Sequence, residues 1–265
     1  MRSGREFSTQ FLRFQKDKIM NQVLYYILSA IAALIALTVH EYCHGYAAYR
    51  LGDDTAKNMG RLTLNPLHHI DPYGAICMVL FHVGWAKPVP INPTNFKNPK
   101  KDFAITAAAG PASNLVLGFI SAFIYLLTFA LVRDIRFESD FAFNLVSNTL
   151  NFLFIFHSVN IGLGLFNLLP IPPFDGSRLL NVILPPDKYF AIMKYERKIY
   201  YGVLAWLLLG DYAAMGVRMI PLVRNIPVLY WLAGALSLSD MLGTVIRWVS
   251  DLMLGFWQLI PFLKI

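Results

Sequence analysis

The sequence is 265 residues long, and 56% of its residues are hydrophobic whereas only 15% are charged. A soluble domain usually carries about 25% charged residues, so this composition argues against a soluble protein and indicates a membrane protein. The formal net charge of +7 does not predict a nucleic-acid partner, because the sequence contains no basic module with interleaved aromatic residues. In a membrane protein, Lys and Arg instead collect in cytoplasmic loops.

The chain starts with a basic extension followed by an apolar helix. Residues 1–20 are polar and show no apolar period, so we expect a flexible extension, and Met20 is a candidate for the natural start. An apolar stretch then runs from about Gln22 through Val39, and a transmembrane helix needs about 20 such residues. We expect this helix to continue to about Leu51, because a glycine follows it and glycine often marks a helix end.

The connection over residues 55–103 is rich in Pro, Gly, Asn and Lys. A loop of this length is usually functional. Its alternating polar and apolar residues at 60–65 predict a strand, and its prolines at 87–93 predict an extended segment. The apolar residues at 75–83 are too few to span a bilayer, so we expect a small β-hairpin or a re-entrant loop that lies against other protein.

Four further apolar stretches follow, at residues 103–132, 141–169, 199–222 and 226–263. The last contains charged residues, so it is either one long helix or a helix followed by an interfacial piece. The predicted fold class is an all-α multi-pass membrane protein with about five to six transmembrane helices and a small β-hairpin or re-entrant loop near its active site. We expect three parts, namely the extension at 1–20, a core at 21–200 and a C-terminal transmembrane region at 201–265.

The distribution of Lys and Arg predicts the orientation in the membrane. The loops at 53–102 and 177–198 carry six and five basic residues, whereas the turn at 133–140 carries two. Both large loops are therefore expected in the cytoplasm. The parity of the spans then puts the N-terminus outside, which conflicts with its own five basic residues unless residues 1–19 are not native.

The strongest motif is His40-Glu41-Tyr42-Cys43-His44. Histidines four residues apart lie on one face of a helix, so their imidazoles can share one Zn²⁺ while Glu41 reaches a metal-bound water as general base. Two unrelated helical histidines are the alternative. Ionisable residues at the end of an apolar span are costly and are usually functional, which favours the metal site.

A catalytic zinc site needs a third protein ligand and an open position. The chain has four glutamates, and none besides Glu41 suits this depth in the membrane. Asp175 is the candidate among the aspartates, because it lies in a Pro-rich turn after a long apolar helix. Gly176 next to it allows a tight turn that can direct a carboxylate toward a metal. An ordinary polar turn at a helix end is the alternative.

These motifs together resemble the site-2 protease family of intramembrane zinc proteases, in its compact bacterial branch without a PDZ domain. The similarity extends over residues 22–200 and rests on segments at residues 40–44, 60–66, 84–90, 110–114 and 169–176. In the last segment, Pro172-Pro173 stands where the family usually has Asn-Pro, and the aspartate stays in place.

The resemblance implies an intramembrane zinc metalloprotease that hydrolyses peptide bonds of transmembrane substrates. His40, His44 and Asp175 would hold one Zn²⁺ per chain, and Glu41 would activate the zinc-bound water. Asn114 is our candidate for stabilising the oxyanion, and helix–helix hydrogen bonding is its alternative role. The expected partners are a transmembrane protein or peptide and membrane lipid. The expected location is a bacterial plasma membrane, with the active site toward the cytoplasmic side.

Other interpretations stay open from the sequence. A membrane metal-ion transporter would also use His and Asp ligands, although transport does not need a glutamate beside the first histidine. The predicted strand at 62–65 could clamp an unwound substrate by adding it to a sheet edge, or it could be only structural. Four other histidines are rival ligands, namely His68, His69, His82 and His157.

Overall fold

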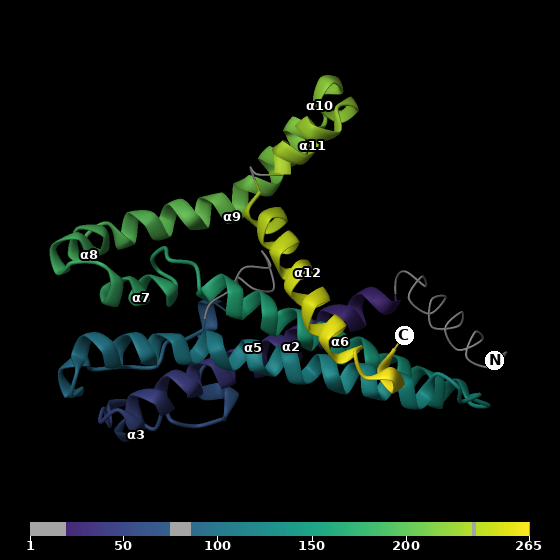
Figure 1. Cartoon of the computed structure of the whole chain (residues 1–265), viewed down its shortest axis with the longest axis horizontal. Helices are drawn as coiled ribbons and strands as arrows, with labels where there is room; N and C mark the ends of the chain where they lie inside the picture. The colour runs from purple at the N-terminus through teal and green to yellow at the C-terminus, as the bar shows by residue number, and fades with distance from the viewer. Residues whose placement is uncertain (1–19, 75–85, 235–236, 265) are drawn as a thin grey trace. The chain divides into compact units, whose positions relative to one another are not determined.

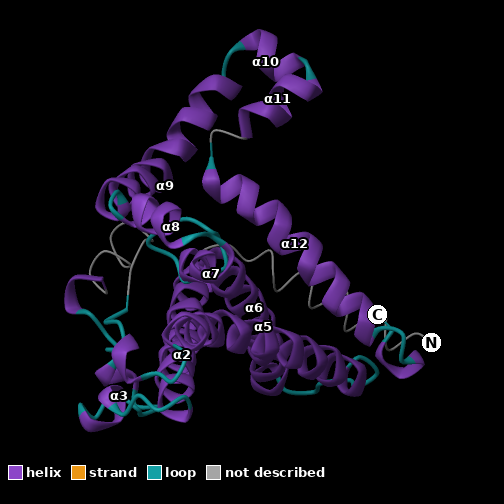
Figure 2. Cartoon of the chain, turned by 60° about the vertical axis from the view of Figure 1, so that its left-hand side comes forward, coloured by secondary structure: helices purple, strands orange, loops and turns teal. Residues whose placement is uncertain are grey.

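The computed structural model describes residues 20–74, 86–234 and 237–264, which are mainly helical (Figure 1). The long helices are α2 (Met20–Arg50), α5 (Pro99–Val132), α6 (Asp140–Asn167), α9 (Glu196–Arg218) and α12 (Leu238–Trp257). The shorter elements are α3 (Thr55–Asn58), η1 (Pro66–His68), η2 (Pro93–Asn95), α7 (Gly176–Ile183), α8 (Pro186–Met193), α10 (Pro221–Asn225), α11 (Pro227–Ala233) and η4 (Pro261–Leu263). Figure 2 draws no strand in the described residues, so the all-α prediction is confirmed for them.

Three helices are long and apolar enough to cross a membrane, namely residues Gln22–Arg50 of α2, together with α5 and α6. Helix α9 adds a fourth candidate if its two halves, which meet at a bend of 42°, form one span. Helix α12 does not qualify, because Asp240, Arg247 and Asp251 put three ionisable groups into its 20 residues, and such groups are costly in a bilayer. The described residues therefore support three to four spans, and the predicted five to six are not confirmed.

The chain divides into two compact units. The first comprises Met1–Leu37, Asn114–Leu163 and Trp248–Ile265, and the second comprises Thr38–Ser113 and Gly164–Arg247. The boundary between the units falls inside four helices, so each of them contributes one part to each unit, namely α2, α5, α6 and α12. Both units are consequently built from segments that are far apart in the sequence.

In the first unit, α5 packs against α6 and against the C-terminal segment. Phe129 and Leu150 are buried together, and Leu126 is buried against Leu263. Trp257 Nε1 also donates a hydrogen bond of 3.0 Å to a carbonyl oxygen of α5. Helices inside a membrane associate through such van der Waals contacts and hydrogen bonds, so these contacts hold the unit together.

In the second unit, α2 ends in a turn that directs the following residue inward. Gly52 has a φ of +107°, a conformation that favours glycine. Asp53 N–H donates to Ala48 O at 2.9 Å and Gly52 N–H donates to Tyr49 O at 3.2 Å, which is the pattern of a Schellman cap. The predicted end of the helix near Leu51 agrees with this turn, and Asp53 is left fully buried.

The connection between α2 and α5 differs from the prediction. Residues 60–65 form the end of a turn, a bend and irregular backbone rather than a strand. Asn65 caps η1 by accepting a hydrogen bond from Leu67 N–H. Within the described part of this connection, one isolated antiparallel bridge pairs Ile70 with Ala86, so the predicted β-hairpin is not confirmed. The predicted re-entrant stretch at 75–83 lies outside the described residues, as do His82 and the N-terminal residues 1–19.

Candidate active site

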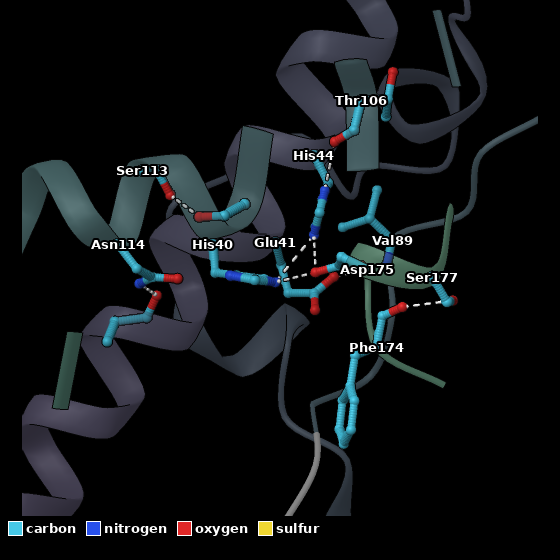
Figure 3. Close-up of polar contacts among 12 residues, drawn as sticks. His40, Glu41, His44, Val89, Thr106, Ser113, Asn114, Phe174, Asp175 and Ser177 are labelled. Carbon is cyan, nitrogen blue, oxygen red and sulfur yellow. Dashed lines mark hydrogen bonds and ion pairs between the residues drawn. The ribbon is translucent and has the colours of Figure 1, made fainter. Parts of the chain in front are cut away.

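Two histidines on α2 form the first half of the site. His40 and His44 are both buried, and their ring centroids lie 4.6 Å apart. Their Nε2 atoms approach each other to 3.0 Å. The four-residue spacing puts the two rings on one helical face, and both point toward the same place in Figure 3.

The turn between α6 and α7 brings a carboxylate to this pair. Asp175 Oδ2 lies 3.1 Å from His40 Nε2 and 3.2 Å from His44 Nε2 (Figure 3). The turn is tight, because a Cβ on Gly176 would lie 2.2 Å from the carbonyl oxygen of Leu168. A side chain at position 176 would therefore displace the aspartate, which gives a structural reason for the glycine beside it.

The three ligand atoms form a set that suits a zinc ion. They lie 3.0 to 3.2 Å from one another, and a tetrahedral zinc site with bonds of about 2.0–2.1 Å separates its ligand atoms by about 3.3 Å. His44 Nδ1–H donates to the carbonyl oxygen of Thr106 at 2.7 Å, which leaves the Nε2 lone pair for a metal. Such a bond commonly orients a zinc-bound histidine.

Helix α5 approaches the histidines at a position without a side chain. A Cβ on Gly110 would lie 2.4 Å from His44 Nε2 and 2.8 Å from His40 Cε1. Real Cβ atoms essentially never make contacts under 3.0 Å, so glycine is required for this close approach. The backbone of α5 is thus packed directly against the two imidazoles.

The surroundings of Asp175 favour its ionised form. Burial by itself raises the pKa of this carboxyl group, but hydrogen bonds and charge from His40 and His44 outweigh burial and hold the pKa well below its ordinary value. An ionised carboxylate is the form that binds a cation. The site therefore presents two imidazoles and one carboxylate, which is a ligand set of catalytic zinc sites.

Glu41 lies beside the histidine pair and is held by the loop that precedes α5. Val89 N–H donates to Glu41 Oε2 at 2.9 Å (Figure 3). The Val89 side chain is buried, and its Cγ1 would be 3.2 Å from a Cβ on Gly45, so it packs closely on α2. A backbone group from a distant loop therefore fixes the orientation of this carboxylate.

Comparisons with known proteins agree with this geometry. The sequence matches peptidase family M50 over residues 28–209. The chain belongs to this family. It is 40% identical over 195 residues to "Putative zinc metalloprotease YwhC" of Bacillus subtilis, which covers 72% of this chain and 85% of that protein. It is 30% identical over 172 residues to "Putative zinc metalloprotease Rip2" of Mycolicibacterium smegmatis, covering 63% of this chain and 61% of that protein.

No solved structure matches the chain. Membership of family M50 confirms the predicted resemblance to the site-2 proteases. The names of both relatives agree with the predicted class of enzyme, a zinc metalloprotease. The family match gives no support to the alternative of a metal-ion transporter. The helices that are long and apolar enough to cross a membrane agree with an M50 protein that lies in a membrane.

The predicted oxyanion stabiliser, Asn114, takes part in a buried polar network of this M50 protein. Its side chain is fully buried, and Nδ2 donates to Ala36 O at 3.1 Å and to Asn160 Oδ1 at 2.9 Å. Asn160 Nδ2 in turn donates to Phe156 O at 2.8 Å. These bonds join α2, α5 and α6, which fits the alternative role in helix association, and a role toward substrate stays a prediction.

The rival histidines do not join the candidate metal site in the described residues. His68 is exposed, and His69 is buried with Nε2 bonded to the Thr63 carbonyl oxygen at 2.8 Å. His157 is buried between α5 and α12. Among the described His, Cys, Asp and Glu residues, the group that could hold a metal comprises His40, His44 and Asp175.

Three residues of the site were not identified as site residues from the sequence. Thr106 contributes a backbone carbonyl and Val89 contributes a backbone N–H. Every residue type has a backbone carbonyl, and every type except proline has a backbone N–H, so the residue type gives no hint of either role. Gly110 belongs to a segment that supports the family resemblance, yet its role depends on how closely α5 approaches α2. A run of small residues around Gly110 was the available hint, since small residues allow close helix packing.

Proposed function

We propose that this M50 protein hydrolyses peptide bonds of transmembrane substrates with one Zn²⁺ held by His40, His44 and Asp175. The observation that carries the proposal is the meeting of these three ligand atoms, all within 4.8 Å of one another. Two come from a helix able to span a membrane, and the third comes from a turn 131 residues further along the chain. Glutamate stands directly after the first histidine, in the position of a general base.

A zinc ion bound there would polarise the scissile carbonyl and lower the pKa of a bound water. Glu41 accepts the proton of the attacking water and then delivers it to the leaving amine nitrogen. Val89 N–H binds Oε2 and leaves Oε1 available to accept the proton. The hydrogen bond to Thr106 O keeps His44 in the tautomer that presents Nε2.

The location that we propose is a bacterial plasma membrane, with the active site toward the cytoplasmic side. Three to four candidate spans support a membrane protein. The basic residues of the two large loops support a cytoplasmic position for both. Asp175 lies two residues before the second of these loops, and Glu41 contacts the first through Val89. A transmembrane protein or peptide is therefore the substrate that we expect to reach the site.

Glu41→Gln tests the role of the base. The substitution keeps the shape of the side chain and removes its basicity, so the purified variant should retain zinc while losing cleavage by about 10²-fold or more. Membrane proteomes of cells that produce the wild type or Glu41→Gln would reveal substrates as fragments or precursors that accumulate with the variant. Glu138→Gln is the matched control, because Glu138 is exposed. Normal cleavage by Glu41→Gln would refute the mechanism.

Asp175→Ala tests the third ligand. Removing one of three protein ligands should lower both the zinc content and the cleavage rate, whereas Glu41→Gln lowers only the rate. Zinc per protein is measured by elemental analysis after dialysis against a metal buffer. Full zinc occupancy in Asp175→Ala would exclude this residue as a ligand.

A further inference from the structure

We propose that Asp53 is a positioning residue for catalysis, which acts on Glu41 through the extended segment of residues 87–92. The inference rests on the proposed role of Glu41 as the general base. Asp53 lies beyond the end of α2 and outside the ligand set, but its carboxylate holds the segment that supplies the hydrogen bond to Glu41. We call residues 87–92 the positioning segment.

The Asp53 carboxylate is buried and surrounded by donors. Its side chain is 0% exposed, and Oδ2 accepts from Asn92 N–H at 2.7 Å. Oδ1 accepts from Asn95 Nδ2 at 2.7 Å, from Thr55 N–H at 3.1 Å and from the Thr55 hydroxyl. Hydrogen bonds to an ionised acceptor are among the stronger ones in proteins, so Asp53 holds the C-terminal end of the positioning segment firmly.

The other end of the positioning segment is also anchored. Arg61 is buried and its Nη2 donates to Lys87 O at 2.7 Å, while Lys87 N–H donates to His69 O at 2.9 Å. Prolines at 88 and 90 fix φ at two further positions. A stiff segment held at both ends transmits a displacement of one end to its middle.

The middle of the positioning segment contacts the proposed base. Val89 N–H donates to Glu41 Oε2, and Asn92 N–H, three residues later, donates to Asp53 Oδ2. Glu41 and Asp53 do not act on each other through a short contact, because the nine helical steps from Glu41 to Arg50 already extend about 13 Å. The positioning segment is thus the physical connection between the two carboxylates.

Loss of the Asp53 anchor should therefore affect the rate more than substrate binding. An asparagine at position 53 can keep its oxygen at the three donors that Asp53 Oδ1 now accepts. Its amide nitrogen then faces the N–H of Asn92 in place of Oδ2, so the C-terminal end of the segment shifts. A displacement of about 1 Å at a reacting group can lower the rate about 10²-fold. We expect kcat to fall about 10- to 100-fold, with KM and zinc content close to those of the wild type.

The matched control is Asp54→Asn, the same substitution one residue further along. Asp54 is exposed, and its carboxylate lies 3.9 Å from Lys57 Nζ, an ion pair that contributes little to stability. Wild type, Asp53→Asn, Asp54→Asn and Glu41→Gln are compared in proteoliposomes with a quenched single-span model peptide. Zinc content and thermal unfolding are measured on the same preparations.

A double-mutant cycle separates positioning from general stabilisation. Val89→Pro removes the N–H that binds Glu41, and the neighbouring prolines already favour its extended conformation. If Asp53 acts through this N–H, the double variant Asp53→Asn, Val89→Pro should lose no more kcat than the worse single variant. If the two residues act independently, the losses in activation free energy of the single variants add in the double variant. A double variant that shows this full additive loss would overturn the proposal.

The remaining outcomes are also decisive. Normal cleavage by Glu41→Gln would refute the proposed function itself. An inactive Glu41→Gln with kcat of Asp53→Asn equal to that of Asp54→Asn would refute only the positioning role. If Asp53→Asn does not fold, Asn95→Ala removes one donor to Asp53 and should still lower kcat about threefold. An unchanged kcat in folded Asn95→Ala would then overturn the inference.

Discussion

Replacement of Gly110 by alanine tests the architecture of the metal site most directly. In an ordinary helix, alanine is more stable than glycine by about 0.5–1 kcal/mol, so the substitution would usually be harmless. At this position the added Cβ would lie 2.4 Å from His44 Nε2, 2.6 Å from His44 Cε1 and 2.8 Å from His40 Cε1. The structure therefore predicts the opposite sign.

The size of the effect follows from these distances. Non-bonded carbon atoms normally stay about 3.5–4.0 Å apart, so the methyl group overlaps both imidazoles by about 1 Å. Overpacking of this kind costs about 1–3 kcal/mol, and part of the strain can be relieved by rotating the two rings away. Because both rings are proposed ligands, we expect Gly110→Ala to weaken zinc binding about 10- to 100-fold and to lower the cleavage rate accordingly.

The assay is zinc content against a graded series of chelator concentrations, together with thermal unfolding in detergent. Gly202→Ala is the matched control, since a Cβ there would meet nothing within 4 Å and the position is also helical. Gly202→Ala should keep its zinc and unfold at the wild-type temperature or slightly above it. Wild-type zinc affinity in folded Gly110→Ala would refute the close approach of α5 to the histidines.

Two further predictions concern groups away from the metal site. Burial raises the pKa of Asp53, but hydrogen bonds from Thr55, Asn92 and Asn95 outweigh burial and lower this pKa. The stabilisation that ionised Asp53 contributes is therefore present above the unfolded-state pKa near 3.9 and is lost as pH falls through the folded-state pKa. The Tm difference between wild type and Asp53→Asn should shrink on acidification, and a constant difference would contradict this. Ser250→Ala removes the hydroxyl that donates to buried His157 Nε2 at 2.7 Å, which should destabilise the protein by about 1–3 kcal/mol in denaturant unfolding without changing its zinc content.

The helices that are marked by a continuous apolar stretch or by the spacing of residues along the chain were predictable from the sequence. The helix carrying His40 and His44 was expected to run from Gln22 to about Leu51, and α2 spans Met20–Arg50. The four-residue spacing of the histidines required a shared helical face. These features depend on neighbours along the chain, so one sequence is enough to specify them.

Other parts of the structure were not predictable in the same way. The alternation at 60–65 suggested a strand, but Asn65 and Pro66 start a 3₁₀ turn there, and local capping outweighed the short alternating pattern. The predicted span count is not confirmed, because apolar length alone does not show whether the charged groups in α12 exclude this helix from the bilayer. Asp175 was a candidate from its turn, but its distance to the histidines required the fold.

The placement of Asp175 outside the apolar part of α6 has a physical reason. A carboxylate in the middle of a span would be costly until a metal binds, whereas the turn after α6 leaves Asp175 partly exposed, with a side chain 25% accessible. His40 and His44 bind zinc as neutral imidazoles, so in the metal-bound protein they add no charge of their own to the apolar helix. The placement of the carboxylate ligand in the turn lets the fold form before the metal arrives. It also predicts that metal-free protein keeps its helices, and far-UV circular dichroism of chelator-treated protein would contradict this if helicity were lost together with zinc.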